Sequence, residues 1–329
     1  MSSGKKNILV TGGAGFIGSN LVDTLINDDR IGHVRVLDNL STGFLHNIEQ
    51  HFSNSKFEFI EGDIRDYHIC LKACDQMDMV SHQAALGSVP RSVKDPLTTN
   101  EVNITGMLHV LTAAKESKVG RFIYAASSST YGDSEALPKK EELIGSPLSP
   151  YAVSKYVNEL YASVYHRCYG MEVIGLRYFN VFGPRQSPTG AYAAAIPLFI
   201  RHLLDGTSPT INGDGFHSRD FTFVANAVQA NQLALFTKNK SAIGEVFNVA
   251  YGEQTSLLTL FETIRNIIGI KIDPVFGPER AGDIKHSHAN INKAKHMLGY
   301  TPSINLETGL QQTINWHRVE NEVGQLNKT

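Results

Sequence analysis

The chain has 329 residues, of which 42% are hydrophobic and 19% are charged, and its formal net charge is -2. This length and balance fit a nucleotide-binding core with a smaller appended region, and they exclude a disordered or fibrous chain. The small net charge excludes a broad basic face for nucleic acid, and no secretory or membrane-spanning apolar run is present in the sequence.

The cysteines and histidines point to no metal site. The three cysteines lack a Cys-x-x-Cys spacing, which suits a reducing compartment, and Cys70 and Cys74 are expected to be small buried hydrophobic side chains. No histidine spacing resembles a helical metal pair. We therefore expect a cytoplasmic protein without metal, nucleic-acid or membrane partners.

The first half of the chain alternates short β-branched runs with amphipathic segments. Strands are predicted at residues 7–10, 34–38, 57–60, 79–82, 121–126 and 173–176. Helices are predicted at residues 20–26, 106–115 and 151–169, the last with Ser149 as its cap and Pro150 in its first turn. This alternation predicts an α/β fold with a Rossmann-type, doubly wound parallel sheet.

After residue 180 the chain changes to loops interrupted by glycine and proline. Helices are predicted at residues 195–204, 225–235 and 256–268, and a strand at 246–250. We expect residues 1–180 to form a dinucleotide-binding domain and residues 181–329 a smaller, mixed α/β substrate domain. A segment near 220–250 is expected to return to the first domain.

A glycine-rich turn directly follows the first predicted strand. Residues 11–18 read TGGAGFIG, and a helical pattern comes next. Such glycines permit a tight turn and let backbone amides touch a pyrophosphate, whose charge the helix N-terminus favours. Together with Asp38, about 20 residues further on, the turn predicts a dinucleotide site. The Asp38 carboxylate would accept hydrogen bonds from ribose hydroxyls and repel a 2′-phosphate, which favours NAD over NADP.

Two further positions at strand ends are candidates for the same site. Asp63 follows the third predicted strand, where it would bind the adenine amine or simply cap a helix. Ala84 and Ala85 follow the fourth predicted strand and are small enough for a cofactor to lie against the backbone.

A tyrosine and a lysine lie four residues apart on one helix face. A cation beside the Tyr151 phenol favours the phenolate, which makes Tyr151 a candidate general base, and Lys155 could also hold the nicotinamide ribose. The fifth predicted strand leads into Ser127, at the edge of the sheet where ligands of such folds bind. Together, Ser127, Tyr151 and Lys155 predict an enzyme that converts an alcohol to a ketone by hydride transfer.

At this point the sequence resembles the extended short-chain dehydrogenase/reductase superfamily, and within it the UDP-sugar 4-epimerases. The resemblance runs from about residue 6 to about residue 309. It rests on residues 10–18 (VTGGAGFIG), 38–43 (DNLSTG), 82–85 (HQAA), 151–155 (YAVSK), 176–184 (LRYFNVFGP), 219–221 (RDF) and 280–283 (RAGD).

The resemblance implies roles for individual residues. It implies that Ser127, Tyr151 and Lys155 are catalytic. The implied cofactor contacts are Gly12, Gly15, Phe16, Ile17, Gly18, Asp38, Asn39, Asp63, Ile64, Ala84, Ala85, Asn103, Tyr151, Lys155 and Tyr178. The implied substrate contacts are Gly87, Ser88, Ser127, Ser128, Ser129, Asn180, Ala194, Arg219, Arg280, Asp283 and Ser287.

The resemblance also implies a mechanism and a homodimer formed through helices of the first domain. In the mechanism, Tyr151 takes the proton of the C4 hydroxyl while C4 gives a hydride to NAD. The resulting 4-keto sugar rotates in the site and is then reduced on its other face. Related dehydratases carry an Asp-Glu pair where this chain has Ser128 and Ser129, so dehydration is not expected.

The choice of sugar is predicted from the size of the residues implied to line the pocket. In similar epimerases a tyrosine at the position of Ser287 restricts the enzyme to sugars without an N-acetyl group. The small side chains of Ser287, Gly87, Ser88 and Ala194 therefore favour UDP-N-acetylglucosamine. One alternative is a UDP-glucuronate decarboxylase or 4-epimerase, for which Arg91 and Arg185 are candidate cations. Another is a regulatory protein that binds NAD without turnover.

Overall fold

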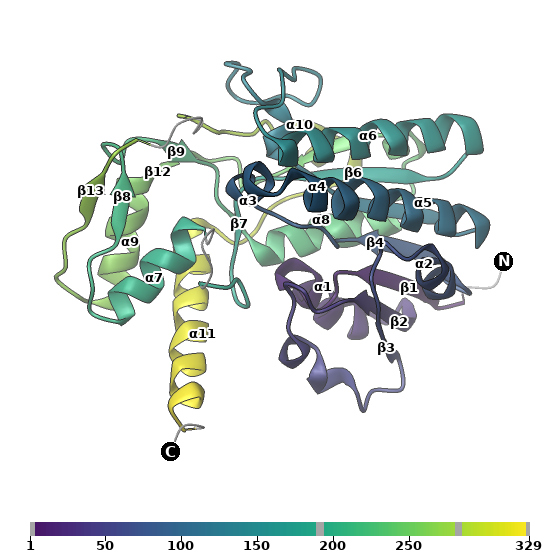
Figure 1. Ribbon diagram of the computed structural model, residues 1–329, viewed down its shortest axis with the longest axis horizontal. Helices are drawn as coiled ribbons and strands as arrows, with labels where there is room; N and C mark the ends of the chain where they lie inside the picture. Colours follow the sequence, from purple (N-terminus) through teal and green to yellow (C-terminus); the bar gives the residue numbers. More distant parts are fainter. Residues whose placement is uncertain (1–3, 189–193, 280–284, 327–329) are drawn as a thin grey trace.

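A parallel sheet forms the centre of the computed structural model, which describes residues 4–188, 194–279 and 285–326 (Figure 1). Within these residues the sheet has seven strands in the order β11-β6-β5-β4-β1-β2-β3. The strands are β1 (Lys6–Thr11), β2 (Ile31–Asp38), β3 (Phe57–Glu61), β4 (Met79–His82), β5 (Arg121–Ser127), β6 (Val173–Tyr178) and β11 (Val246–Val249). The order reverses between β1 and β4, and ligands bind at such switch points.

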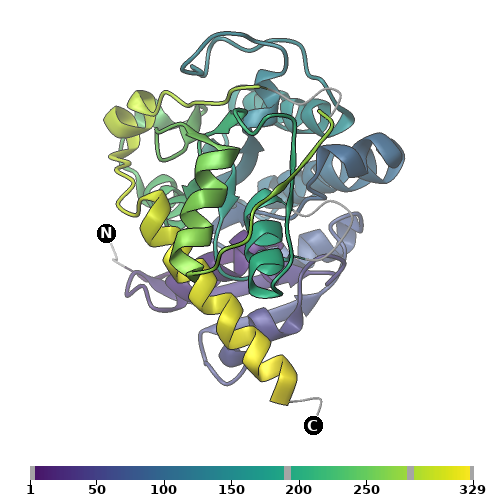
Figure 2. The same ribbon diagram turned by 90° about the vertical axis from the view of Figure 1, so that its left-hand side faces the viewer.

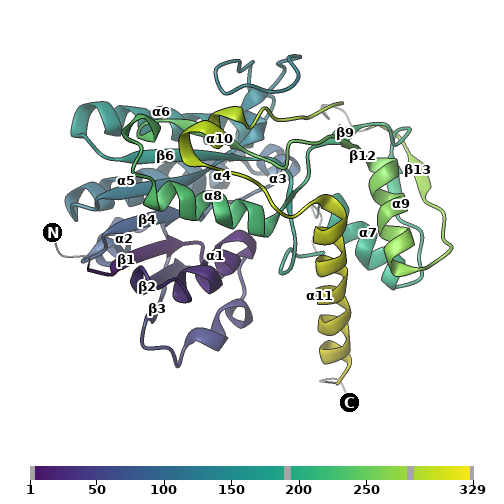
Figure 3. The same ribbon diagram turned by 180° about the vertical axis from the view of Figure 1, so that it is seen from behind.

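Helices cover both faces of the sheet. One core cluster joins the sheet to α1 (Phe16–Ile26), α8 (Val224–Phe236) and α10 (Asn292–Leu298), and Figure 3 shows this face. A second cluster joins the opposite face to α2 (Tyr67–Cys74), α5 (Met107–Glu116) and α6 (Pro150–Tyr169). The short helices α3 (Val89–Lys94) and α4 (Pro96–Asn100) lie against α6. The arrangement is the doubly wound Rossmann-type fold.

A smaller group of helices and strands lies beyond the carboxyl ends of the central strands (Figure 2). It contains α7 (Ala195–Leu204), α9 (Leu257–Ile268) and α11 (Leu306–Leu326). Beside them lie three strand pairs: β7 (Val181–Phe182) with β10 (Thr222–Phe223), β8 (Thr210–Asn212) with β13 (Val275–Gly277), and β9 (Ser218–Arg219) with β12 (Thr255–Ser256). The chain leaves this group twice, for α8 and β11 and again for α10.

The predicted strands are confirmed, with boundaries that differ by a few residues. The first helix begins at Phe16 rather than at the predicted residue 20. The glycine-rich turn ends at the N-cap residue, Gly15, so Gly18 of the motif already lies in the first turn of α1. The predicted cap of α6 is confirmed, since the Ser149 hydroxyl accepts a hydrogen bond from the Ala152 amide at 3.1 Å. The helices α2, α3, α4, α10 and α11 were not predicted, and the domain boundary at residues 180/181 stays a prediction.

A buried ion pair fixes α6 to the sheet. Arg177 on β6 donates to both carboxylate oxygens of Glu159 on α6, at 2.8 and 2.7 Å. Arg177 also donates to the Glu141 carbonyl at 3.0 Å and lies 4.8 Å from the centre of the Tyr131 ring. Since two buried partners satisfy each other in a bidentate geometry, α6 has a defined rotation relative to β5 and β6.

Candidate active site

A cavity of about 570 Å³ lies at the carboxyl ends of the central strands. The structure brings most of the predicted site residues to its wall. These are Gly12, Gly15, Phe16, Ile17, Gly18, Asp38, Asn39, Asp63, Ile64, Ala84, Ala85, Gly87, Ser88, Ser127, Ser128, Tyr151, Lys155, Tyr178 and Asn180.

The glycine-rich turn brings the backbone close to the end of β4. Gly12 has a φ of +70°, and a Cβ atom there would lie 2.6 Å from the Ala84 nitrogen. A Cβ atom at Gly18 would lie 2.1 Å from the Gly12 carbonyl oxygen. No side chain caps the N-terminus of α1, whose first turn carries no acidic residue. Its amides are therefore available to an anion, and this arrangement fits the pyrophosphate of a dinucleotide.

Asp38 ends β2 and is 8% exposed. Its carboxylate accepts hydrogen bonds from the amides of Ala14 at 2.9 Å and Leu40 at 2.8 Å. Burial raises the pKa of Asp38, and these amides partly offset that effect. The amides leave acceptor positions on the carboxylate free for ribose hydroxyls, so the residues present fit the adenosine end of NAD.

Asp63 belongs to a small charged cluster. It pairs with Arg65 at 2.7 Å and accepts a hydrogen bond from the Asn39 amide at 2.9 Å. The Arg65 guanidinium is the largest cause that lowers the pKa of Asp63, to about 2. Asp63 is not the cap of α2, because Asp66 holds that position. Its predicted contact with the adenine amine stays a prediction.

Tyr151 and Lys155 lie on the same face of α6, as their spacing predicts. The Lys155 ammonium is 6.0 Å from the centre of the Tyr151 ring and donates to the Ala125 carbonyl at 2.9 Å. Burial lowers the pKa of Lys155 to about 8. Burial also raises the pKa of Tyr151, and a hydrogen bond with Ser127 opposes this shift. The shift of the Tyr151 pKa here comes from burial and Ser127, so the lowering expected from Lys155 and bound NAD⁺ stays a prediction.

The three consecutive serines at the end of β5 have different roles: two line the cavity, and the third supports one of them. Ser127 and Ser128 line the cavity, whereas Ser129 does not. The Ser127 hydroxyl accepts from the Ser129 amide at 3.1 Å and from the Ser129 hydroxyl at 2.9 Å. Ser129 therefore orients Ser127, whose own hydroxyl proton remains available to Tyr151 or to a ligand.

Asn103 supports the wall without forming part of it. It is 1% exposed, and it both accepts from the Leu86 amide at 2.8 Å and donates to the Leu86 carbonyl at 3.1 Å. It also donates to the Ser154 hydroxyl at 3.1 Å. Asn103 therefore fixes the loop after β4 to α6, and the cofactor contact that the resemblance implies stays a prediction.

A buried polar network beneath Tyr178 contains residues that sequence analysis missed. The Tyr178 hydroxyl donates to Gln83 at 3.1 Å and accepts from Asn231 at 2.7 Å. Gln83 donates in turn to Asn231 at 3.0 Å and to Ser81 at 2.9 Å. Asn231 lies on α8, and no motif around it signals this role. Gln83 could have been identified from the sequence, because it directly precedes Ala84 in the HQAA motif at residues 82–85.

A second cavity, of about 260 Å³, adjoins the first. Both cavities are lined by Asn180, Val181 and Gln186, and the second also by Ala194 and Arg219. The structure thus brings together three predicted substrate contacts, Asn180, Ala194 and Arg219. The Arg219 guanidinium donates to the carbonyls of Ser218 at 2.9 Å and Lys285 at 3.3 Å.

Some of the remaining candidates lie elsewhere. Arg280 and Asp283 fall outside the described residues. Ser287 is 9% exposed, lines neither cavity, and donates its amide to the Ser218 carbonyl at 3.0 Å. Its expected place in the wall is therefore not seen. Arg91 lines neither cavity, whereas Arg185 lines the first and pairs with Asp23 at 2.8 Å.

Comparison with known proteins gives consistent similarities over nearly the whole chain. Residues 8–250 match the model of the NAD dependent epimerase/dehydratase family. The UDP-glucose 4-epimerase of Mycolicibacterium smegmatis is 37% identical over 313 residues, which cover 94% of this chain and 98% of that protein.

Two solved structures are similar in both fold and sequence. UDP-N-acetylglucosamine 4-epimerase from Methanobrevibacter ruminantium, in complex with UDP-N-acetylmuramic acid, has a TM-score of 0.91 and 40% identity, covering 96% of this chain and 99% of that one. UDP-glucuronic acid 4-epimerase from Bacillus cereus, with UDP-glucuronic acid and NAD, has a TM-score of 0.87 and 35% identity, covering 95% and 99%. Among the described helices of this chain, none is long and apolar enough to cross a membrane.

The lowered pKa of Lys155 predicts a pH effect on stability. Because the folded pKa is about 8 and the usual value is 10.5, the unfolded chain binds more protons between these pH values. The unfolding free energy of the cofactor-free protein should therefore rise with pH across this range, relative to a Lys155→Met variant. The relative gain is on the order of 3 kcal/mol at most. Denaturant titrations of both proteins at several pH values measure it, and a difference that does not change with pH would contradict the buried ammonium.

Proposed function

Because the chain belongs to the NAD dependent epimerase/dehydratase family, we propose that it interconverts UDP-N-acetylglucosamine and UDP-N-acetylgalactosamine by epimerisation at C4. The chain is an NAD-dependent UDP-sugar 4-epimerase in its general activity. The observation that carries the proposed epimerisation is one shared wall, because Ser127, Tyr151 and Lys155 lie on the same cavity as the glycine-rich turn.

The roles of the three side chains follow from their positions. Tyr151 takes the proton of the C4 hydroxyl and later returns it, while Ser127 orients that hydroxyl. Lys155 is a fixed cation beside the phenol, held by the Ala125 carbonyl. When bound, NAD would supply a reversible acceptor for the hydride of C4, so no cofactor would be consumed. Asp38 and the amides of the glycine-rich turn would hold it.

The adjoining cavity is suited to the nucleotide part of the substrate. Arg219 lies on its wall, and Asn180, Val181 and Gln186 connect it with the reaction cavity. A guanidinium on this wall would bind the diphosphate through charge-assisted hydrogen bonds. The sugar would then extend past Asn180, Val181 and Gln186 into the reaction cavity and reach Tyr151.

Space near the reaction cavity supports the N-acetylated sugar. Gly87 lines the cavity, and a Cβ atom at this position would have no neighbour within 4 Å. Ser88 on the same wall and Ala194 on the adjoining one are also small. A similar structure at 40% identity is that of a UDP-N-acetylglucosamine 4-epimerase, which agrees with this choice.

The uronate alternative depends on a free cation near C6 of the sugar. Arg185 lines the reaction cavity, but its guanidinium is already paired with Asp23, which weakens this alternative. Incubation with UDP-N-acetylglucosamine, UDP-glucose and UDP-glucuronate, without added NAD, separates the possibilities by product. We expect the C4 epimer of the acetylated sugar to form fastest. Turnover of the glucuronate alone would overturn the proposal, and binding of NAD with no turnover of any sugar would indicate a regulatory protein.

The base can be tested by removing one oxygen. Tyr151→Phe preserves the ring and its packing but lacks the proton acceptor, so turnover should fall by about 10²-fold or more. NAD content and unfolding free energy, measured in parallel, serve as controls for an intact fold. Near-normal turnover by this variant would remove Tyr151 from the mechanism.

The sugar choice can be tested at Ser287. Ser287 lines neither cavity, so this prediction rests on the resemblance: if a tyrosine at this position restricts the sugar site as in similar epimerases, Ser287→Tyr should lower turnover of UDP-N-acetylglucosamine relative to UDP-galactose by roughly tenfold to two-hundredfold. The ratio of the two kcat/KM values in one protein preparation cancels any general loss of stability. An unchanged ratio would show that Ser287, which lies outside both cavity walls, does not set the choice.

We also propose that the partner of this chain is a second copy. Val153, Leu160 and Val164 form an apolar face on α6 and are 45%, 50% and 40% exposed. Leu97 on the neighbouring α4 is 77% exposed. A two-fold axis beside α6 would bury this face against itself. Leu160→Glu should then yield monomers in sedimentation experiments, whereas Val319→Glu on α11 should not, and a monomeric wild type would contradict the proposal.

A further inference from the structure

A short segment between the two cavities, residues 183–187, forms part of the cofactor cavity and is here called the strap. Arg185, Gln186 and Ser187 line the reaction cavity, and Gln186 also lines the adjoining cavity. The strap follows β7 and therefore belongs to a part of the chain far from the glycine-rich turn. It contributes a wall to a site that the first domain otherwise builds.

The backbone of the strap is held in uncommon conformations. Arg185 has a φ of +70° and Gly183 a φ of +151°. A left-handed conformation at a residue other than glycine costs energy and persists only where the surroundings hold it. The contacts that hold the strap therefore matter for its shape.

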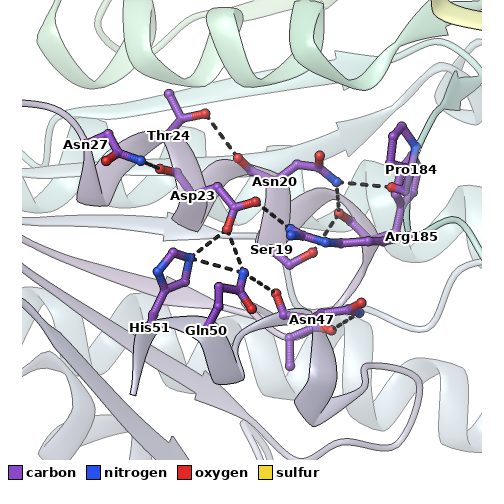
Figure 4. A network of polar contacts seen from close by, with 12 residues as sticks. Ser19, Asn20, Asp23, Thr24, Asn27, Asn47, Gln50, His51, Pro184 and Arg185 are labelled. Atoms are coloured by element: carbon purple, nitrogen blue, oxygen red, sulfur yellow. Dashed lines mark hydrogen bonds and ion pairs between the residues drawn. The ribbon is translucent and has the colours of Figure 1, made fainter. Parts of the chain in front are cut away.

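Two of those contacts come from α1, the helix whose first residues line the cofactor cavity (Figure 4). The Asn20 amide donates to the Pro184 carbonyl at 3.2 Å and also to the Phe16 carbonyl at 2.9 Å. One turn further along α1, Asp23 pairs with Arg185 at 2.8 Å, a distance typical of a close ion pair. Two neighbouring positions on one helix face thus hold both the backbone and the side chain of the strap.

The same carboxylate extends the network toward the adenosine end of the cavity. The other oxygen of Asp23 accepts from Gln50 at 3.1 Å and contacts a ring nitrogen of His51 at 2.6 Å. Gln50 donates to the Asn47 carbonyl at 3.1 Å, and the Asn47 amide donates to the Ala14 carbonyl at 2.8 Å.

The network therefore reaches the turn that would hold the pyrophosphate. The Ala14 amide of the glycine-rich turn also donates a hydrogen bond to Asp38, the candidate acceptor for the ribose hydroxyls. Polar contacts thus run from the strap to the glycine-rich turn and to Asp38, on the adenosine side of the expected NAD site.

We propose that Asn20 and Asp23 are positioning residues that fasten the strap over the cofactor cavity and so keep NAD bound through the catalytic cycle. An epimerase must retain its cofactor between the two hydride transfers, because loss of the reduced form would leave a keto sugar and an inactive enzyme. Neither residue lines the cavity itself, so each acts on the strap through Pro184 or Arg185. The proposal depends on NAD as cofactor and not on which sugar is used.

The test measures exchange of bound NAD with labelled NAD in the purified holoenzyme. Asp23→Asn and Asn20→Ala should each speed this exchange by about tenfold or more, and both together by more than either alone. With NAD in excess, kcat should change by less than about threefold, because Tyr151, Lys155 and Ser127 are untouched. Asp23→Glu retains the charge and should restore slow exchange.

Asp28→Asn is the matched control. Asp28 forms a comparable ion pair with Arg30 at 2.6 Å just beyond the end of α1, and it lines neither cavity. Bound NAD in the Asp28→Asn variant should exchange at the same rate as in the wild type. Wild-type exchange in Asp23→Asn, or equal acceleration in Asp23→Asn and Asp28→Asn, would overturn the proposal, since the second result would reflect only a general loosening of α1. The NAD exchange measurement needs no substrate, so failure of the sugar proposal would not be mistaken for failure of this one.

Discussion

The site depends on one buried hydrogen bond, from the Lys155 ammonium to the Ala125 carbonyl at 2.9 Å. It joins α6 to the end of β5, and the Glu159 to Arg177 pair joins α6 to the neighbouring strand β6 one turn later along the helix. An ammonium that is 3% exposed is costly, and the carbonyl offsets part of that cost. The consequence is a fixed position for Tyr151, one turn earlier on α6, beside Ser127 at the end of the same strand.

Desolvation also explains why the free protein does not have an activated tyrosine. Burial raises the pKa of Tyr151 and lowers that of Lys155 to about 8, so the two values move apart and both shifts favour the neutral side chains in the protein without ligands. The positive charge of NAD⁺, when bound, would favour the phenolate of Tyr151.

Sequence patterns predicted the sheet, the glycine-rich turn and the α6 pair, because each depends on local spacing: a strand period, a turn that only glycine permits, and a separation of four residues on a helix. They could not predict supports contributed from a distance. Asn231 reaches Tyr178 from α8, Asp23 reaches Arg185 from α1, and Asn103 fixes Leu86 rather than facing the cavity. Such contacts depend on tertiary packing, which leaves no period in the sequence. The comparisons supplied the general activity, whereas the choice of sugar stays a proposal.

The central claim is that one cofactor molecule removes a hydride from C4 and returns it to the same carbon. The direct measurement uses UDP-N-acetylglucosamine that carries deuterium at C4, with the enzyme in ordinary water. The account predicts that the epimeric product retains deuterium at C4, because the hydride never exchanges with solvent. Loss of the label to water, through removal of a proton from carbon, would contradict it.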